Sequence, residues 1–270
     1  MGLELGRSDA HLRQAAVRAM NPKITDWQGK RVWLVGASTG IGAALAHELA
    51  RRGARLALSA RRIDKLQALG LSDALLLPCD ATQSDSLAAA RITLIAAWGG
   101  VDLVIYLAGD YVPMRADSFD LAVAERVLAV NFNGAMRLAA ALLPDLRAGG
   151  GIAFVASVAG YRGLPKALCY GPGKAALIHF AEVLHLDLLP QNIGVWVINP
   201  GFVATQLTAQ NDFDMPALLS PEQAAMLTVD GFSSGAFEIH FPKRFTRLMK
   251  FLAHLPYGWY FPLIRRLTGG

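Results

Sequence analysis

Short apolar runs alternate with longer stretches of helix-forming residues along most of the chain. The apolar runs lie at residues 32–35, 55–59, 74–78, 101–107, 151–157, 194–199 and 237–241. The helical stretches lie at 43–52, before 69, at 84–98, 118–147 and 169–189, and from 221 onward. Short apolar strands between helices require a parallel sheet that is covered on both faces. The pattern therefore predicts an α/β fold with a doubly wound parallel sheet of about seven strands and a helical C-terminal extension.

Length and composition favour one large domain. The chain has 270 residues, of which 53% are hydrophobic and 17% are charged, which is enough apolar material for a sizeable core. We expect an N-terminal extension over 1–25 that includes a short helix from Asp9 to Met20. A single domain over 26–241 and a tail over 242–270 follow.

The sequence predicts neither a targeting signal nor a disulfide. No run reaches about 18 uninterrupted apolar residues, the length of a membrane-spanning helix. The N-terminus lacks the hydrophobic core of a signal peptide. Cys79 and Cys169 are the two cysteines, too few for a disulfide framework or a metal site. We therefore expect a cytoplasmic protein without a bound metal.

A glycine-rich turn joins the first strand to the first helix, in RVWLVGASTGIGAALAHELARRG at residues 31–53. Glycine permits the backbone angles of such a turn and lets the main chain approach a pyrophosphate at the helix N-terminus. The alternative is a glycine turn with a purely structural role. We predict a dinucleotide site formed by Gly36, Ser38, Thr39, Gly40, Ile41 and Gly42.

Small or polar residues close or follow several predicted strands. They are Gly36, Arg61, Asp80, Gly109, Ser157 and Asn199. The carboxyl ends of parallel strands share one edge of the sheet, and ligands bind there near the point where strand order reverses. We therefore expect one crevice to collect these side chains.

The end of the second strand indicates the cofactor. An NAD site usually has an acid there for the ribose 2′-hydroxyl, whereas this chain has Arg61 and Arg62. Two guanidinium groups suit a 2′-phosphate, which arginine binds with paired charge-assisted hydrogen bonds. The alternative is a solvated helix start. We predict NADP(H), with Asp80 accepting from the adenine amino group, capping the next helix, or both.

Tyr170 and Lys174 stand at i and i+4, on one helix face. A nearby ammonium favours phenolate, so we expect Lys174 to lower the pKa of Tyr170 from its usual value of about 10. A tyrosine tuned in this way exchanges a proton with a carbonyl or alcohol oxygen near neutral pH. Ser157 ends a strand at the same edge, and Asn131 lies in the preceding helix. The alternatives are a strand-end cap, a buried polar group, a core aromatic and a solvated charge for Ser157, Asn131, Tyr170 and Lys174.

In this order, downstream of the glycine turn, these residues resemble the short-chain dehydrogenase/reductase family. The resemblance covers about residues 29–205 and implies a Rossmann-like fold with hydride transfer between a nicotinamide and a substrate carbon. It rests on VGASTGIG, Asp80, YLAG at 106–109, Asn131, Ser157, Tyr170 with Lys174, and Asn199-Pro200-Gly201 with Thr205.

The resemblance also implies a role for each residue. Tyr170 is then the acid/base, Lys174 lowers its pKa and binds the nicotinamide ribose, and Ser157 orients the carbonyl. Asn131 holds a proton-relay water. A homodimer or homotetramer through the helices of Asn131 and Tyr170 is also implied. The rest of the implied cofactor site is Ala108, Gly109, Pro200, Gly201, Val203 and Thr205.

Three segments depart from the family pattern. Val35 replaces a threonine, and Tyr106-Leu107 replaces two asparagines, which removes supporting polar links. Gly171-Pro172-Gly173 replaces better helix formers. Pro172 is compatible with a helix that begins near Tyr170, because its missing N–H would lack a helical partner there anyway.

The tail is basic and amphipathic. Residues 241–270 contain no acid, although the net charge of the whole chain is only +5. A basic amphipathic helix followed by aromatics suits a membrane interface; the alternative is a core-packing or dimer-forming segment. One face of the predicted helix holds Phe245, Leu248, Met249, Leu252 and Leu255, and the other holds Lys243, Arg247 and Lys250.

Together these features predict an NADP(H)-dependent oxidoreductase that interconverts a carbonyl and an alcohol on a lipophilic substrate. Residues 202–235 are expected to cover the substrate. We expect no nucleic-acid partner, because the basic charge is confined to the tail. The alternatives are a catalytically silent NADP(H)-binding scaffold at a membrane surface and a sugar-nucleotide epimerase, which shares Tyr-x-x-x-Lys but has a larger C-terminal substrate domain.

Overall fold

A seven-stranded parallel sheet forms the centre of the computed structural model, which describes residues 20–268. Its strand order is β3-β2-β1-β4-β5-β6-β7, and the order reverses between β1 and β4. The predicted fold class is therefore confirmed, and a crevice is expected at the carboxyl ends of these two strands. The strands are β1 (Arg31–Val35), β2 (Arg55–Ser59), β3 (Leu75–Leu76), β4 (Leu103–Tyr106), β5 (Gly151–Val155), β6 (Gly194–Pro200) and β7 (Glu238–Phe241).

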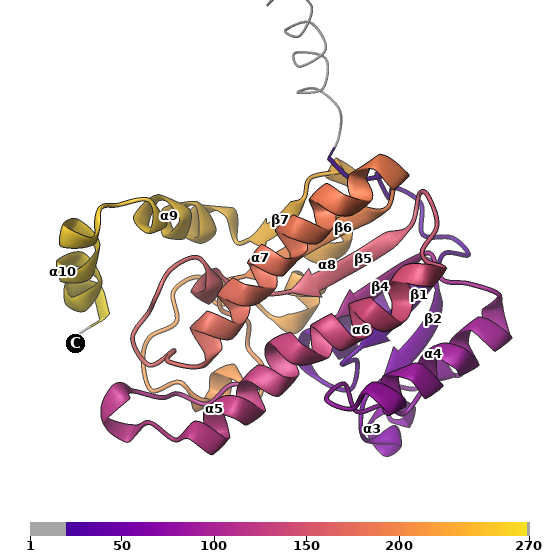
Figure 1. Ribbon diagram of the computed structural model, residues 1–270, viewed down its shortest axis with the longest axis horizontal. Coiled ribbons are helices and arrows are strands. Elements are labelled where there is room, and N and C mark those ends of the chain that lie inside the picture. Colours follow the sequence, from indigo (N-terminus) through magenta and orange to yellow (C-terminus); the bar gives the residue numbers. More distant parts are fainter. Residues whose placement is uncertain (1–19, 269–270) are drawn as a thin grey trace, which may run out of the picture.

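Helices cover both faces of the sheet (Figure 1). Successive side chains of β1 enter opposite cores, because side chains alternate along a strand. Trp33 packs with helices α4, α6 and α7 on one face, and Val32 and Leu34 pack with α2 and α8 on the other. The longer helices of the domain are α2 (Gly40–Arg51), α3 (Ile63–Gln67), α4 (Ser84–Trp98), α5 (Leu121–Leu128), α6 (Gly134–Leu142), α7 (Tyr170–Leu188) and α8 (Pro221–Gly231).

The helix predicted over 118–147 is interrupted. A π-helical turn over Ala129–Asn133 separates α5 from α6. The buried Tyr106 hydroxyl donates a 2.6 Å hydrogen bond to the Val130 carbonyl inside this turn. The predicted helical region is therefore confirmed, but the π-helical turn inside it was not predicted, because helical periodicity does not register a contact from a side chain on a neighbouring strand.

Asp80, which was predicted as a possible cap of the next helix, does not occupy the N-cap position of α4. Gln83 precedes the first residue of that helix, Ser84. Thr82 donates to the Asp80 carboxylate through its amide and its hydroxyl. These bonds close the turn between β3 and α4, so Asp80 stabilises the turn before the helix rather than capping the helix.

Residues 21–25, which we assigned to the extension, lie against the domain. The Asn21 side chain donates to the Val195 carbonyl at 2.7 Å and accepts from the Val195 amide at 2.9 Å. Ile24 is buried beside Trp27 in one of the two cores. Apart from Met20, the helix predicted from Asp9 lies outside the described residues.

Within residues 20–268, one helical stretch is long and apolar enough to cross a membrane. It runs over Leu121–Asp145 with a mean hydropathy of 1.3 and includes α5 and α6. These helices pack against α7 and α4 over the sheet. Core helices of soluble proteins satisfy the same length and composition, so the stretch is weak support for a membrane span.

Helices α9 (Lys243–Ala253) and α10 (Tyr257–Thr268) extend beyond β7 to one side of the molecule, which confirms the helical C-terminal region (Figure 1). Leu252, Tyr260 and Ile264 are buried between these helices. The two faces predicted for α9 do not separate buried from exposed side chains. Leu248, on the apolar face, is 52% exposed, and Lys250, on the basic face, binds the carboxylate of Glu238 on β7. The carboxylate on a distant strand selects the face that packs, and the hydrophobic pattern of α9 alone does not contain that information.

Candidate active site

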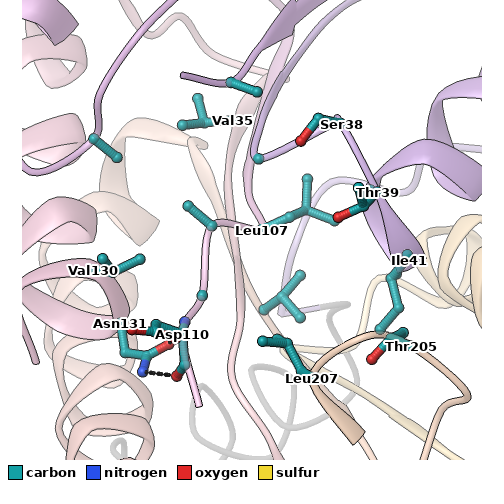
Figure 2. Close-up of a pocket in the computed structure, with 18 of the residues that line it drawn as sticks. Val35, Ser38, Thr39, Ile41, Leu107, Asp110, Val130, Asn131, Thr205 and Leu207 are labelled. Atoms are coloured by element: carbon teal, nitrogen blue, oxygen red, sulfur yellow. Dashed lines mark hydrogen bonds between the residues drawn. The ribbon is translucent and has the colours of Figure 1, made fainter. Parts of the chain in front are cut away.

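A cavity of about 490 Å³ opens at the carboxyl ends of the strands. Figure 2 shows Asn131 and Asp110 on one side of this cavity and Thr39 and Ile41 on the other. Every residue predicted to be catalytic or to bind the cofactor lines it. They are Gly36, Ser38, Thr39, Gly40, Ile41, Gly42, Arg61, Arg62, Asp80, Ala108, Gly109, Asn131, Ser157, Tyr170, Lys174, Pro200, Gly201, Val203 and Thr205. Asn199, which was expected in the same crevice, does not line it, because its side chain donates to Glu238 at 2.7 Å instead.

Close backbone contacts explain the glycines of the first turn. Gly36 has φ +102, and a Cβ there would lie 2.4 Å from the Ala108 amide nitrogen. A Cβ on Gly42 would lie 2.2 Å from the Gly36 carbonyl oxygen. The Thr39 side chain makes no capping hydrogen bond to α2. The first residues of α2, Gly40, Ile41 and Gly42, line the cavity, and the amides of a helix's first turn have no partner within the helix, which is the arrangement expected of a pyrophosphate site.

Basic and acidic side chains meet at the end of β2 and β3. Arg61 and Arg62 are exposed at the rim of the cavity. Burial alone would raise the pKa of Asp80, but hydrogen bonds from Thr82 and the nearby charge of Arg61 outweigh it and lower that pKa. Asp80 is therefore an anionic acceptor beside two cationic donors.

Helix α7 begins at Tyr170, as the position of Pro172 required. Pro172 lies in its first turn, where the missing N–H costs no helical hydrogen bond. Gly173 packs against α5, and a Cβ there would lie 3.1 Å from Leu128 Cδ2. The glycines that weaken this helix turn therefore permit a close approach between α7 and α5.

The predicted effect of Lys174 on Tyr170 is wrong in this structure. Desolvation raises the pKa of Tyr170 to about 12, although a hydrogen bond with Ser157 lowers it in part. Lys174 Nζ lies 5.6 Å from the centre of the Tyr170 ring and donates to the Val155 carbonyl oxygen at 2.9 Å. Burial lowers the pKa of Lys174 to about 7. Desolvation is therefore the main cause of the pKa shift of both groups.

Asn131 is buried in the π-helical turn and is fixed by two hydrogen bonds. Its Nδ2 donates to the Asp110 carbonyl oxygen at 2.6 Å, and its Oδ1 accepts from the Asp110 amide at 3.2 Å (Figure 2). The Asp110 carboxylate accepts from Arg126 Nε at 3.1 Å. Asp110 and Arg126 were not predicted from the sequence, although the position of Asp110 directly after Gly109 was an available signal.

The departures from the family pattern have structural substitutes. The Tyr106 hydroxyl binds the carbonyl next to Asn131, as described above, and so supports the turn that holds the asparagine. The Val35 carbonyl oxygen accepts from the amides of Leu107 and Ala108 at 2.8 and 2.9 Å. Backbone bonds and one phenol thus connect β1, β4 and the α5–α6 turn.

A tyrosine from the segment after β4 stands beside the candidate acid. The Tyr111 ring packs edge-on against Tyr170, with 5.0 Å between the ring centres. The Tyr111 hydroxyl donates to Asn211 Oδ1 at 3.0 Å, and Phe202 packs against Phe213 at 5.9 Å. The segment after β6 therefore reaches Tyr111 beside Tyr170, in the region where a covering segment is predicted.

Comparisons with known proteins agree with this site. A family model described as short chain dehydrogenase matches residues 30–215. An uncharacterized oxidoreductase of Myxococcus xanthus is 36% identical over 230 residues, which cover 81% of this chain and 91% of that protein. The 11-beta-hydroxysteroid dehydrogenase-like 2 of Arabidopsis thaliana is 33% identical over 191 residues, which cover 67% of this chain and 61% of that protein. This chain thus spans less than two thirds of the Arabidopsis relative.

Two crystal structures share the fold. A short chain dehydrogenase from Burkholderia cenocepacia in complex with NADP has a TM-score of 0.73 and 25% identity, over 80% of this chain and 96% of that one. A short chain dehydrogenase/reductase from Burkholderia phymatum in complex with NAD has a TM-score of 0.76 and 20% identity, over 84% and 94%. Proteins of this fold therefore bind either nicotinamide cofactor.

Proposed function

We propose, since the chain belongs to the short-chain dehydrogenase/reductase family, that it is an NADP(H)-dependent oxidoreductase that interconverts a carbonyl and an alcohol. One observation supports this above all others. Ser157, Tyr170, Lys174 and Asn131 line the same cavity as the glycine turn of β1–α2. Convergence of a proton donor, an orienting hydroxyl and a nucleotide-binding turn is what hydride transfer to a carbonyl requires.

The side chains divide the proton chemistry among them. Bound nicotinamide supplies the hydride for reduction and accepts it in oxidation. Tyr170 donates its phenolic proton to the carbonyl oxygen as the C–H bond forms, and Ser157 orients that oxygen. The high pKa of Tyr170 keeps it protonated and ready to act as the acid. Lys174 binds the nicotinamide ribose, and Asn131 holds a water that restores the proton.

The arginine pair favours NADP(H) over NAD(H). Arg61 and Arg62 line the cavity at the end of β2, where an NAD site has a carboxylate. Their guanidinium groups match the charge and geometry of a 2′-phosphate. One of the two Burkholderia structures is in complex with NADP and the other with NAD, so they do not distinguish the two cofactors. The proposed preference for NADP(H) therefore rests on the two arginine side chains.

The substrate end favours a lipophilic carbonyl or alcohol. Leu207 lines the cavity, and Phe213 and Leu218 are 42% and 45% exposed nearby in the chain. The Arabidopsis relative is named after a hydroxysteroid dehydrogenase, and steroids are apolar. The name is therefore consistent with a lipophilic substrate.

We also propose that the protein is cytoplasmic and contacts membranes through its C-terminal tail. Trp259 is 72% exposed and Phe261 is 55% exposed on α10, which carries Arg266 in its last turn. Exposed aromatics beside basic groups suit the interface of an anionic bilayer. The variant Trp259→Ser/Phe261→Ser should sediment less than the unchanged protein with anionic vesicles, and equal sedimentation would contradict membrane contact.

We propose a homodimer or homotetramer as well. Val183 and Leu186, on the outer side of α7, are 44% and 69% exposed. Helices that present apolar side chains in this way are suited to pairing with a second copy. Sedimentation velocity would show a single monomeric species if this part of the proposal is wrong.

Turnover of an aldehyde and ketone panel with NADPH tests the main proposal. Tyr170→Phe should reduce kcat by at least about 100-fold while NADPH still binds, because general acid catalysis typically contributes 10²–10⁴-fold. NADPH binding without turnover on any substrate would favour the silent scaffold instead. Full activity of the Tyr170→Phe variant would refute the role of this residue.

A further inference from the structure

Four polar side chains form a cluster behind the cavity. Glu238 on β7 accepts hydrogen bonds from the Tyr161 hydroxyl, from Asn199 Nδ2 at 2.7 Å and from Lys250 Nζ on α9. We call Tyr161, Asn199, Glu238 and Lys250 the Glu238 cluster. Its members come from four separate segments of the chain.

The cluster is an ion pair with limited access to water. The Lys250 and Glu238 side chains are 33% and 21% exposed. Burial opposes ionisation of Glu238, but the hydrogen bonds from Lys250, Tyr161 and Asn199 outweigh it and lower its pKa. Burial and the Glu238 carboxylate both raise the pKa of Tyr161, so this phenol remains a donor. Three donors thus converge on one carboxylate.

Asn199 connects the cluster to one wall of the cavity. Asn199 precedes Pro200 and Gly201, which line the nicotinamide end. The Gly201 amide donates to the Phe241 carbonyl oxygen at 2.7 Å. A Cβ on Gly201 would lie 2.9 Å from Cδ1 of Phe245, so α9 packs immediately behind this turn.

Tyr161 leads to the other wall. It follows a short 3-10 turn, Val158–Gly160, that begins after Ser157. A Cβ on Gly160 would lie 2.8 Å from the main chain of Lys174. A shift of Tyr161 would therefore reach the segment between the candidate orienting serine and α7.

Further contacts fix α9 and α10 to the same segment. Arg162 Nη1 donates to the Ala253 carbonyl oxygen at 2.8 Å, and its guanidinium lies 4.2 Å from the centre of the Tyr260 ring. The fully buried Thr246 hydroxyl pairs with His240 Nδ1 at 2.6 Å. Helix α9 is thus held at both ends of its inner face.

We infer that Glu238 and Lys250 are positioning residues for the nicotinamide end of the cavity. Their ion pair ties α9 to the Pro200–Gly201 turn and to the segment after Ser157, and so holds the two walls at a fixed separation. The inference rests on the proposed function, because it assigns the nicotinamide to this end. The adenine end, at Arg61 and Asp80, has no contact with the cluster.

Glu238→Gln and Lys250→Met test the inference against a matched control. Arg31 and Asp102 form an ion pair with 33% and 31% side-chain exposure, at the amino ends of the central strands β1 and β4 and so away from the cavity. Asp102→Asn should lower Tm without changing the kinetics. Glu238→Gln and Lys250→Met should lower kcat about tenfold, because small displacements of reacting groups cost rates of this order or more.

Cofactor binding gives a readout that does not depend on turnover. In both cluster variants the Kd of NADPH should rise less than about threefold, because the adenine end still holds the cofactor. The fluorescence of bound NADPH, which reports the surroundings of the nicotinamide, should fall. Lys250→Arg should restore both signals. Unchanged NADPH fluorescence and kcat, with a Tm loss equal to that of Asp102→Asn, would overturn the inference.

The two proposals fail in different ways. If the unchanged protein binds NADPH but turns over no carbonyl, the proposed function fails, and the fluorescence comparison still decides the role of the cluster. If turnover is normal in the cluster variants, the inference fails and the proposed function stands.

Discussion

Lys174 donates its hydrogen bond to the Val155 carbonyl oxygen at the end of β5, and not to Tyr170. The lysine is 4% exposed, and burial alone lowers its pKa to about 7. A buried ammonium with one carbonyl partner is poorly compensated for the water it has lost. The buried Lys174 therefore lowers the stability of the fold, but it places an ionisable group where a bound ligand can contact it.

Lys174→Met should stabilise the fold in a pH-dependent way. The pKa of Lys174 is about 7 in the folded protein and 10.5 without the protein environment. Between these values the unfolded chain binds more protons, so stability rises with pH. Methionine removes this dependence. Its Tm advantage should be largest below pH 7, at least about 2 °C for a domain of this size, and should shrink towards pH 9.5.

Thermal unfolding of both proteins from pH 6 to 9.5 measures this effect. Tyr170→Phe is the control, because the raised pKa of Tyr170 changes stability only above its ordinary value of 10. A Tm difference that stays constant across this pH range would show that burial does not lower the pKa of Lys174 in the folded protein. The Lys174→Met variant should also lose turnover.

Tyr106→Phe should destabilise the protein and slow the reaction. The variant leaves the Val130 carbonyl in the π-helical turn without the phenol that now donates to it at 2.6 Å. Loss of one buried hydrogen bond costs about 1–3 kcal/mol when a partner remains unsatisfied. Because Asn131 follows Val130, kcat should fall more than the Kd of NADPH rises. Urea unfolding and steady-state kinetics would measure these effects. An unchanged kcat would show that the Tyr106 hydrogen bond does not position Asn131 for the proton relay.

The same tyrosine shows where sequence reasoning succeeds and where it ends. The glycine spacing, the strand-end positions and the Tyr170–Lys174 pair all depend on local geometry, so the fold and the set of residues that meet in one cavity could be predicted. Tyr106 could be recognised as a departure, but its partner in the α5–α6 turn is 24 residues away. No local pattern encodes that contact.

Contacts between charged residues that are far apart in the sequence also could not be predicted from the hydrophobic pattern. Lys250 was assigned to the basic face of α9, and the helical wheel of α9 alone does not include its partner Glu238 on β7. The pKa of Tyr170 was predicted in the wrong direction because desolvation depends on the packing of the whole site. Both errors concern energies set by tertiary burial, whereas the residue identities were available from spacing.

Gly36→Ala should abolish cofactor binding, and Gly70→Ala is its matched control. Both glycines have positive φ, +102 at Gly36 and +69 at Gly70. A Cβ at Gly36 would collide with the Ala108 backbone, whereas a Cβ at Gly70 meets no atom within 4 Å. Gly70→Ala should therefore cost only about 1 kcal/mol of backbone strain. Isothermal titration with NADPH should show no binding to Gly36→Ala, and normal binding would place the pyrophosphate elsewhere.

Replacing the arginines at the end of β2 should change the cofactor preference. Arg61 lies near enough to Asp80 to help lower its pKa, so its charge acts at this end of the cavity. In Arg61→Ala/Arg62→Ala, kcat/KM for NADPH should fall about 10- to 100-fold, because a hydrogen bond to a charged group contributes about 1.5–3 kcal/mol. The value for NADH should change little, since NADH has no 2′-phosphate.

Arg61→Asp extends the same argument by restoring the acid that an NAD site uses. The carboxylate should repel the 2′-phosphate and accept a hydrogen bond from the ribose 2′-hydroxyl. The ratio of kcat/KM for NADPH to that for NADH should therefore fall further than in the double alanine variant. Lys65→Ala, on α3 beyond the cavity lining, controls for a general loss of positive charge. Equal losses for NADPH and NADH would mean that Arg61 and Arg62 stabilise the helix start and do not read the phosphate.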